Sequence, residues 1–280
     1  MANPAEPLPS HSLRREAVEG IRVSSSLPFE ITPEWAFGGS NGEGARVCVL
    51  DSGVEADHPM VDGVERAVCV MASGQGMPRV EEDDKGDVFG HGTACAGIIR
   101  SIAPACSIAS VRVLGSSNRG SGEIMLGGLR WAVEQGYDVI NLSLSSTKRE
   151  LTALLHEVAD NAYFQRQAIV ASAHNSAVTS YPWRFSSVIS VGSHELNDPL
   201  AFFYNPAPPV EFFARGSGIE VAWMGGGRIR TSGNSFATAH ISGICALIMS
   251  KHPKLTPFEL KSVLCQTANN VSDEGGQSGG

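Results

Sequence analysis

The sequence predicts an α/β fold, a three-layer sandwich in which a mainly parallel central sheet lies between helices. Short apolar runs rich in Val and Ile recur along the chain, each bounded by Gly, Asn or Ser. Near-continuous runs of this kind are typical of strands buried on both faces, as in parallel sheets. Segments with helical spacing of apolar residues lie between the runs, and this alternation predicts the fold class.

The first expected strand, residues 46–51, places Asp51 at its carboxyl end. The other expected strands span residues 108–114, 139–144, 168–173 and 188–192. Sheets of this class hold their active sites beyond the carboxyl ends of the strands, so Asp51 is a candidate site residue.

Helices are expected between and after these strands. Residues 124–135 form a helical pattern that ends before Gly136, a common stop signal, and residues 149–165 form a second. The longest helix is expected after Ser235, where apolar residues recur with helical spacing. These apolar residues are Ile241, Ile244, Cys245 and Ile248. Thr256 is the expected N-cap of a last helix, with proline and glutamate in its first turn.

Composition excludes several classes of partner. The chain has 280 residues, of which 42% are hydrophobic and 18% charged, with a formal net charge of -8. An acidic chain without a Lys/Arg stripe is a poor ligand for phosphate backbones, so no nucleic acid is expected. No apolar run reaches the length of about 18 residues that spans a bilayer, so no membrane partner is expected.

Cysteine usage favours a reducing compartment. None of the six cysteines forms a C-x-x-C pair, and most lie in apolar runs. The first residues lack a basic segment followed by an apolar run, so they do not resemble a secretory signal. We therefore expect reduced, largely buried thiols in a cytoplasmic protein.

Three segments carry residues suited to nucleophilic catalysis. Residues 49–54 contain Asp51, residues 90–97 contain His91 between two glycines, and residues 232–240 contain Ser235. Taken singly, these are more often a turn residue, a loop residue and a helix N-cap. Together they offer a hydroxyl, an imidazole to take its proton, and a carboxylate to orient the imidazole.

The order Asp, His, Ser and the residues around each resemble the subtilisin-like serine proteases. The similarity covers roughly residues 35–268. It implies the subtilisin-like fold, a peptidase domain at residues 41–271, an N-terminal extension at 1–40 and a flexible tail at 272–280. It implies that Ser235 attacks the peptide carbonyl, His91 acts as general base and then acid, and Asp51 orients His91. Asn175 takes the role of the oxyanion-hole side chain, together with the backbone N–H of Ser235.

The resemblance also implies how a peptide substrate binds. An extended peptide is expected to pair with one edge segment and to contact a second wall beside the specificity pocket. The residues implied for substrate binding are Gly120, Ser121, Gly122, Ser143, Leu144, Ser145 and His174. No cofactor and no metal is expected, because the calcium-binding loop that many secreted relatives carry after the helix of His91 is absent.

Some positions depart from the family pattern. Asn234 stands where a Thr usually precedes the nucleophile, and Ala239 stands where a Pro usually follows it. We expect Asn234 to be able to donate toward the oxyanion. His174 replaces a Gly next to Asn175, so an imidazole there is expected to narrow the pocket and to make cleavage depend on pH. Cys95, one turn after His91, is expected to pack beneath the imidazole.

Other segments are assigned from the residues alone. The acidic run at 81–87 is expected to be a solvated loop, because its spacing fits no EF-hand. The glycines at 225–227 are expected in a hairpin turn. Residues 1–40 are a candidate for a short extension that shields the cleft.

These observations favour a serine endopeptidase acting on peptide or protein substrates. One reading is a general intracellular protease, and another is a dedicated enzyme that processes leader peptides or precursors. A catalytically silent peptide-binding protein is an alternative from another class, motivated by Asn234, His174 and Ala239. Transpeptidation, in which an amine intercepts the acyl-enzyme, would use the same residues and stays open.

Overall fold

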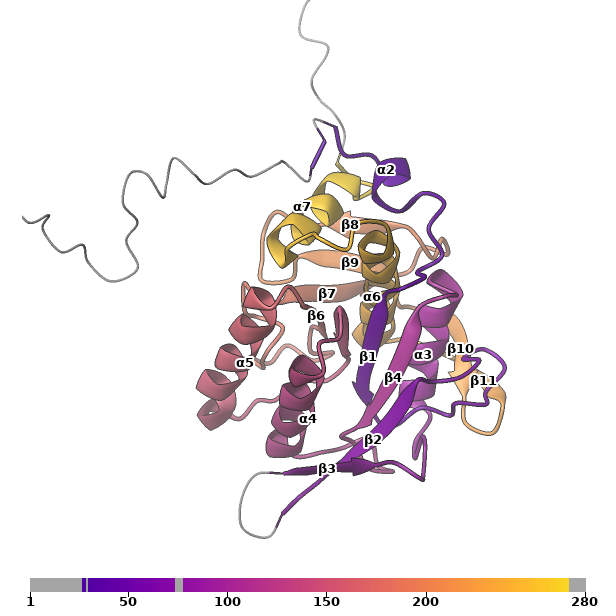
Figure 1. Ribbon diagram of the computed structural model, residues 1–280, viewed down its shortest axis with the longest axis vertical. Helices are drawn as coiled ribbons and strands as arrows, with labels where there is room; N and C mark the ends of the chain where they lie inside the picture. Colours follow the sequence, from indigo (N-terminus) through magenta and orange to yellow (C-terminus); the bar gives the residue numbers. More distant parts are fainter. Residues whose placement is uncertain (1–26, 29, 74–77, 272–280) are drawn as a thin grey trace, which may run out of the picture. The chain divides into compact units, whose positions relative to one another are not determined.

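A computed structural model of the chain describes residues 27–28, 30–73 and 78–271, and those from Ile31 onward belong to one compact unit. Its centre is a nine-stranded sheet with the order β3-β2-β4-β1-β5-β6-β7-β9-β8 (Figure 1). Neighbouring strands are parallel except at the two edges, where β3 and β8 run antiparallel to their partners. The expected α/β fold with a mainly parallel sheet is confirmed.

The strands of this sheet are β1 (Arg46–Asp51), β2 (Arg66–Met71), β3 (Arg79–Glu82), β4 (Ser107–Arg112), β5 (Val139–Leu142), β6 (Ala168–Ser172), β7 (Ile189–His194), β8 (Phe202–Tyr204) and β9 (Phe212–Arg215). A separate hairpin consists of β10 (Ile219–Trp223) and β11 (Gly227–Thr231). The turn between its strands contains Gly225 and Gly226, as expected, whereas Gly227 begins β11 and pairs with Trp223.

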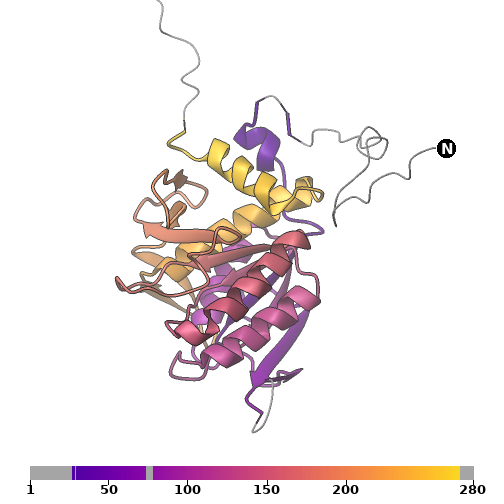
Figure 2. The same ribbon diagram turned by 90° about the vertical axis from the view of Figure 1, so that its left-hand side faces the viewer.

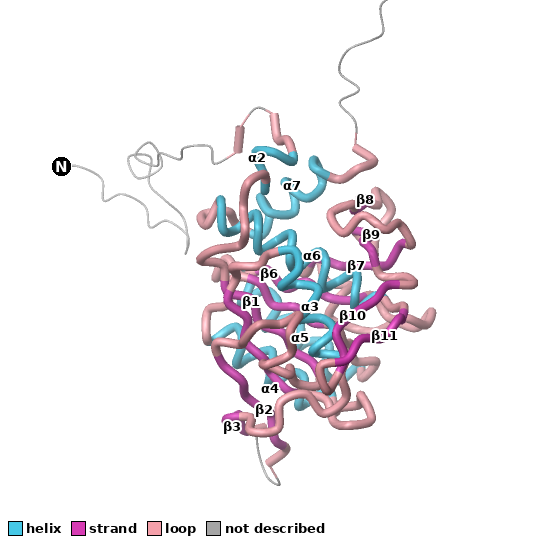
Figure 3. The backbone as a smooth tube through the Cα atoms, turned by 90° about the vertical axis from the view of Figure 1, so that its right-hand side faces the viewer, coloured by secondary structure: helices cyan, strands magenta, loops and turns pink. Residues whose placement is uncertain are grey.

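Two pairs of helices cover the two faces of the sheet. Helices α4 (Gly122–Glu134) and α5 (Thr152–Phe164) lie on one face (Figure 2). Helices α3 (His91–Ile102) and α6 (Asn234–Lys251) lie on the other, with the β10–β11 hairpin packed on α3 (Figure 3). Three shorter elements complete the set: α2 (Pro33–Phe37), a 3-10 turn (Arg149–Leu151) and α7 (Pro257–Thr267). None of the described helices is both long enough and apolar enough to span a bilayer.

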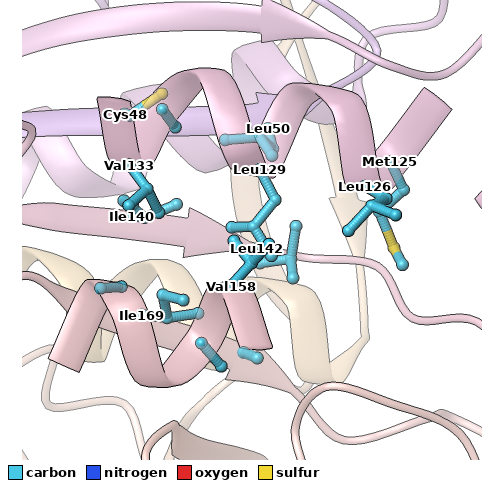
Figure 4. Close-up of a cluster of buried hydrophobic side chains, with 14 of the residues drawn as sticks. Cys48, Leu50, Met125, Leu126, Leu129, Val133, Ile140, Leu142, Val158 and Ile169 are labelled. Carbon is cyan, nitrogen blue, oxygen red and sulfur yellow. The ribbon is translucent and has the colours of Figure 1, made fainter. Parts of the chain in front are cut away.

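The core on the α4–α5 face explains where Asp51 points. Cys48 and Leu50 of β1 pack there with Leu129 of α4 and Val158 of α5 (Figure 4). Because successive side chains of a strand point to opposite faces, Asp51 points to the other face, where α3 lies. The alternation within β1 therefore sends the carboxylate toward the helix that begins with a histidine.

Most expected elements match in kind and differ at their ends. Strand β1 has the expected bounds, whereas β4 and β5 each end two residues earlier than expected. Beyond Arg112 the chain leaves the ladder, since Val113 N and Leu114 N both donate to Asp51 O, at 2.8 and 3.1 Å. Sequence analysis did not predict the edge strands β3 and β8, whose short runs carry no clear periodic signal.

Lys261 of helix α7 binds the segment that precedes β7. The Lys261 ammonium donates to Ser186 O at 2.8 Å and Val188 O at 2.7 Å, and to both oxygens of Glu211 at 2.8 and 2.9 Å. Burial lowers the pKa of Lys261, and the Glu211 carboxylate opposes that shift. These four contacts tie the segment before β7 and Glu211, the residue before β9, to α7.

Two expectations concern residues that lie largely or wholly outside the described part of the chain. The shielding role of residues 1–40 depends mainly on residues 1–26, and the tail begins at residue 272. Both stay predictions.

Candidate active site

Asp51 ends β1 and is completely buried. Its Oδ1 accepts a hydrogen bond from Ser52 N at 2.8 Å, and both carboxylate oxygens face His91. The Nδ1–H of His91 donates to Oδ1 at 2.8 Å and to Oδ2 at 2.9 Å. This contact leaves Nε2 as the ring nitrogen that can take a proton from a hydroxyl.

The pKa of His91 is set by two opposed effects. Burial lowers it, because an imidazolium loses its water there, and the adjacent Asp51 carboxylate raises it. The carboxylate prevails, and the pKa of His91 lies well above its ordinary value. The site therefore favours the protonated imidazole that a general base becomes during acyl transfer.

His91 is the first residue of α3, and the helix start is fastened by a buried carboxylate. Asp87 Oδ1 accepts from Phe89 N at 2.9 Å and Gly90 N at 2.8 Å, and Oδ2 accepts from Thr93 N at 2.9 Å. Thr93 Oγ1 also donates to Asp87 Oδ2 at 2.6 Å. Asp87 thus binds N–H groups that an uncapped helix start would leave without acceptors.

Ser52 links this cap to the end of β1. Its hydroxyl donates to Asp87 Oδ1 at 2.8 Å and accepts from Gly92 N at 3.0 Å. A side chain at Gly92 is not tolerated, since a Cβ there would lie 2.0 Å from Gly53 O. The close approach of these two backbones brings Asp51 and His91 into contact.

Ser235 is the second residue of α6, is buried, and lines the same cleft as His91. Its Oγ donates to Ser143 O at 3.3 Å. Among the described residues no hydrogen bond joins Ser235 Oγ to His91. Catalytic hydrogen bonds are often long without substrate and tighten when it binds, and rotation about one side-chain bond redirects this hydroxyl.

The start of α6 has no side-chain cap. Asn234 N donates to Asn175 Oδ1 at 3.1 Å and Phe236 N donates to Gly233 O at 3.2 Å. Ser235 N has no hydrogen-bond acceptor among the described residues. The side-chain nitrogen of Asn175, Nδ2, also has none there. These two donors, next to the nucleophile, form the arrangement that an oxyanion hole needs.

The expectation that Asn234 donates toward the oxyanion is wrong. Its Nδ2 donates to Ala173 O at 3.1 Å, and its Oδ1 accepts from Ser193 N at 2.9 Å. Both ends of the side chain are bound to backbone beyond β6 and in β7. Asn234 therefore holds the first turn of α6 against the sheet.

A buried polar network lies beneath the catalytic residues. Ser143 Oγ accepts from Asn141 Nδ2 at 3.0 Å and donates to Ser235 O at 3.3 Å. Cys95, which is fully buried, places its sulfur 3.5 Å from Ser143 Oγ and 3.9 Å from Asp51 Oδ2. Burial raises the pKa of the Cys95 thiol, while the nearby imidazole of His91 lowers it, so the thiol is held in its neutral form.

Asp51, His91 and Cys95 form the one group in the described part of the chain whose ligand atoms could hold a metal ion. These atoms lie within 4.8 Å of one another. A metal here would have to break the contact between carboxylate and imidazole. The ligand atoms of these three residues therefore serve the contact between Asp51 and His91 rather than a metal ion.

The catalytic cleft has a volume of about 440 Å³. It contains His91, Ser235, Asn175 and all seven residues that the sequence implied for substrate binding. It also contains residues that sequence analysis did not predict, namely Leu114, Asn118, Arg119, Met125, Ser146, Ser172 and Ala173. Met125 lies in α4 and Ser172 ends β6, whereas the others lie in the loops after β4, β5 and β6, and no motif in the sequence marks them individually.

The segment 120–122, which was expected to pair with an extended peptide, leads into helix α4. Gly120 lies in the chain before α4, whereas Ser121 is the N-cap of α4 and Gly122 its first residue. The Ser121 hydroxyl accepts from Ile124 N at 3.2 Å. A peptide could therefore pair only with the backbone before Ser121.

The acidic run at 81–87 is not a solvated loop throughout. Asp83 has a fully buried side chain that binds Arg112 through two hydrogen bonds of 2.8 and 2.9 Å. Asp87 is the cap of α3 described above. The expectation was wrong for Asp83, whose partner Arg112 lies 29 residues away, and for Asp87, which binds the backbone at the start of α3. Glu81 and Glu82 end β3 and are not in a loop.

Comparisons with known proteins agree with this geometry. The model of the subtilase family matches residues 42–279. Subtilisin DY from Bacillus licheniformis is 31% identical over 250 residues, covering 84% of this chain and 87% of that protein. M-protease from Shouchella clausii (strain KSM-K16) is 29% identical, covering 95% of this chain and 70% of that protein. The crystal structure of a cold adapted subtilisin-like serine proteinase superimposes with a TM-score of 0.67 at 29% identity, covering 84% of this chain and 86% of that one.

Proposed function

The chain belongs to the subtilase family and is a serine endopeptidase, and from that premise we propose that it is a selective processing enzyme of the cytoplasm, with Asp51, His91 and Ser235 as its triad. The observation that carries the triad is the contact of the buried Asp51 carboxylate with His91 Nδ1, at the cleft that holds Ser235.

In the proposed reaction Ser235 Oγ bonds to the peptide carbonyl carbon while His91 Nε2 takes the hydroxyl proton. The carbonyl oxygen becomes an oxyanion, which Ser235 N and the amide nitrogen of Asn175 stabilise. The C–N bond then breaks, and His91 returns the proton to the leaving amine. Water repeats the sequence on the acyl-enzyme, releasing the acid and restoring the Ser235 hydroxyl.

The polar make-up of the cleft supports selectivity. Serine hydroxyls line much of it, and Arg119 is its only Lys, Arg, Asp or Glu side chain. A site whose polar groups must be matched by the substrate rejects unmatched substrates strongly, whereas an apolar pocket discriminates weakly. This chemistry supports cleavage of particular leader or precursor sequences over general proteolysis.

The cysteines support the proposed compartment. All six are free thiols, and five of them are buried. Burial raises the pKa of Cys245 and raises that of Cys106 to about 11, which keeps these thiols neutral and unreactive.

A fluorophosphonate probe tests the nucleophile. We expect it to label the wild-type protein and not Ser235→Ala, which should fold alike and lose about 10⁶-fold in kcat. Equal labelling of both proteins would exclude Ser235.

A mixed peptide library tests selectivity, and fractionation of the native host tests the compartment. Cleavage at one motif supports the processing role, whereas cleavage across unrelated sequences contradicts it. Recovery of the native protein from the medium would contradict a cytoplasmic location.

A further inference from the structure

The side chain of Asn234 bridges β6 and β7 at the point where their ladder ends. Ser172 and Val191 are the last regular pair of the two strands, and Ala173 N still donates to Val191 O at 2.8 Å. In a parallel ladder a residue donates to one residue of the partner strand and accepts from the residue two positions further on. The next bond of a regular ladder would therefore run from Ser193 N to Ala173 O.

The described residues show no direct bond between these two groups. Ser193 N donates instead to Asn234 Oδ1 at 2.9 Å, and Asn234 Nδ2 donates to Ala173 O at 3.1 Å. A primary amide suits this position because it carries an acceptor oxygen and a donor nitrogen on one carbon. The Asn234 amide thus continues the hydrogen bonding between the strands across a gap that its own width keeps open.

The gap opens at the segment that carries one of the proposed oxyanion donors. Asn175 lies two residues beyond Ala173, and its Oδ1 accepts from Asn234 N at 3.1 Å. That contact leaves Nδ2 as the end of the Asn175 amide that can serve a substrate. Asn234 therefore holds this segment twice, through its side chain at Ala173 O and through its backbone N–H at the Asn175 side chain.

The other proposed donor, Ser235 N, belongs to the residue that follows Asn234. The chain before it is fixed to β9, because Gly233 N donates to Gly216 O at 2.8 Å, one residue after that strand. The two backbones are in close contact, since a Cβ at Gly216 would lie 2.8 Å from Gly233 O. Asn234 thus connects the two donors, one through the chain and the other through hydrogen bonds.

The spacing of the two donors matters for catalysis. Oxyanion donors act when they lie about 2.7–3.1 Å from the position of the developing charge. A displacement of about 1 Å in a catalytic group can cost about 10²-fold in rate. A residue that fixes Ser235 N relative to Asn175 Nδ2 therefore affects the rate without touching the substrate.

We propose that Asn234 is a positioning residue, whose side-chain amide bridges β6 and β7 and thereby sets the spacing of the two oxyanion donors. The inference rests on the proposed endopeptidase function and adds to it a residue that contacts neither the substrate nor the reacting atoms. The Thr that the family usually has at this position offers a single oxygen, which spans a shorter gap than an amide does.

Steady-state kinetics of two variants test the role. Asn234→Leu keeps a similar side-chain shape and removes both side-chain hydrogen bonds. We expect kcat to fall by about 10- to 100-fold while KM stays within about 2-fold, because the donors act mainly in the transition state. Asn234→Ser, which is smaller and keeps one hydroxyl, should lose about 3- to 10-fold in kcat and covers the case in which Asn234→Leu does not fold.

A double-mutant cycle shows whether Asn234 acts through Asn175. In an Asn175→Leu background the donor is already lost, so Asn234→Leu should lower kcat by less than about 3-fold further. Multiplication of the two single losses would mean that the residues act independently, and it would overturn the proposal.

A peptide aldehyde inhibitor separates transition-state effects from substrate binding. The Ser235 hydroxyl adds across the aldehyde C=O and gives a hemiacetal whose oxygen lies at the oxyanion position. Asn234→Leu should weaken binding of this inhibitor by about the same factor as kcat, and it should leave binding of the cleaved acyl-side peptide unchanged. Equal weakening of both ligands would assign Asn234 to substrate binding and contradict the positioning role.

Asn270 provides a matched control, because its amide is also bound at both ends. Its Oδ1 accepts from Tyr204 N at 2.9 Å and its Nδ2 donates to Tyr204 O at 2.7 Å, on the edge strand β8. Asn270→Leu should keep the wild-type kcat even where it lowers the melting temperature. Wild-type kcat in either folded Asn234 variant, with or without a lower melting temperature, would show that the amide has a structural role only.

Fluorophosphonate labelling distinguishes failure of this proposal from failure of the function on which it rests. If the probe does not label Ser235 in the wild type, the proposed catalytic site is wrong. If it labels the wild type and the Asn234 variants keep the wild-type kcat, only the positioning role is wrong.

Discussion

Helix α3 begins at the proposed base His91, and α6 begins one residue before the proposed nucleophile Ser235. Both helices lie on the same face of the sheet, yet the N–H groups at their N-termini meet different surroundings (Figure 3). At α3, Asp87 and Ser52 accept the hydrogen bonds of the first N–H groups. At α6, Ser235 N is left without an acceptor among the described residues. A helix N-terminus attracts negative charge, and the two ends differ in where that charge comes from.

At α3 the negative charge is permanent and belongs to the protein. The buried carboxylate of Asp87 holds His91 in place. It also already interacts with the positive end of the helix dipole. In the proposed mechanism the negative charge at α6 arrives only when the oxyanion forms, so the open N–H groups stabilise the transition state more than the substrate. The comparison teaches that the N-terminus of α3 positions His91, whereas the N-terminus of α6 is left open to stabilise the proposed oxyanion.

The largest expected effect comes from removing the carboxylate that acts on His91. Asp51→Asn should lower kcat by about 10⁴-fold, because the amide cannot hold the required tautomer. It should also move the acidic limb of the kcat/KM profile to lower pH. Activity needs neutral His91 and is lost as pH falls through its pKa; Asp51 raises that pKa against burial, so without Asp51 the pKa drops.

Steady-state kinetics across pH check this prediction. Glu55→Gln, which changes a carboxylate that binds the hairpin glycines, is a suitable control and should keep the wild-type profile. An acidic limb that stays in place in Asp51→Asn would show that another group controls it.

The open end of α6 is tested by Asn175→Leu. Loss of one oxyanion donor should lower kcat by about 10²- to 10³-fold while KM changes little, because the donor acts mainly in the transition state. Asn161→Leu, an exposed change on α5, should keep the wild-type kcat. A rise in KM with unchanged kcat would mean that Asn175 binds substrate and leaves the oxyanion to other donors.

The capped end of α3 should respond differently, chiefly through stability. Asp87→Asn replaces an oxygen that accepts both Thr93 N and Thr93 Oγ1, so buried donors lose their acceptor. We expect a loss of about 2 kcal/mol in the free energy of unfolding. A fall of about 10-fold in kcat/KM should accompany it, because His91 is less well positioned.

Chemical denaturation and kinetics of the same samples measure both effects. Asp84→Asn changes an exposed carboxylate in the same run and should alter neither quantity. If Asp87→Asn left stability unchanged, the cap would not be the role of Asp87.

The smallest expected effect is that of Ser52→Ala. It removes one acceptor for Gly92 N and one donor to Asp87, whose other hydrogen bonds remain. We expect a loss of about 1 kcal/mol in stability, less than for Asp87→Asn, and near-wild-type kcat. A larger loss than in Asp87→Asn would make Ser52 the principal support of the helix start.

Sequence analysis predicted the elements whose signals are local. The bounds of β1 follow from one apolar run, and the start of α7 follows from its capping box, which the structure contains. The three proposed triad residues could be named from the sequence because each is embedded in a short, informative motif. The roles of Asp83 and Asp87 were not predicted. Nothing in an acidic run indicates that Asp83 will bind Arg112, 29 residues away, or that Asp87 will accept hydrogen bonds from the backbone at a helix start.

The sequence by itself determined the fold class, the chemistry available for catalysis and the family. Periodicity, residue type and motif order are properties of neighbouring residues and need no folded chain to be read. Tertiary structure alone decided that Asn234 binds the backbone of Ala173 and Ser193, that Ser52 binds Asp87, and that Asp83 binds Arg112. Each depends on hydrogen-bond partners from remote segments, whose directions are set only when the sheet and its helices pack together.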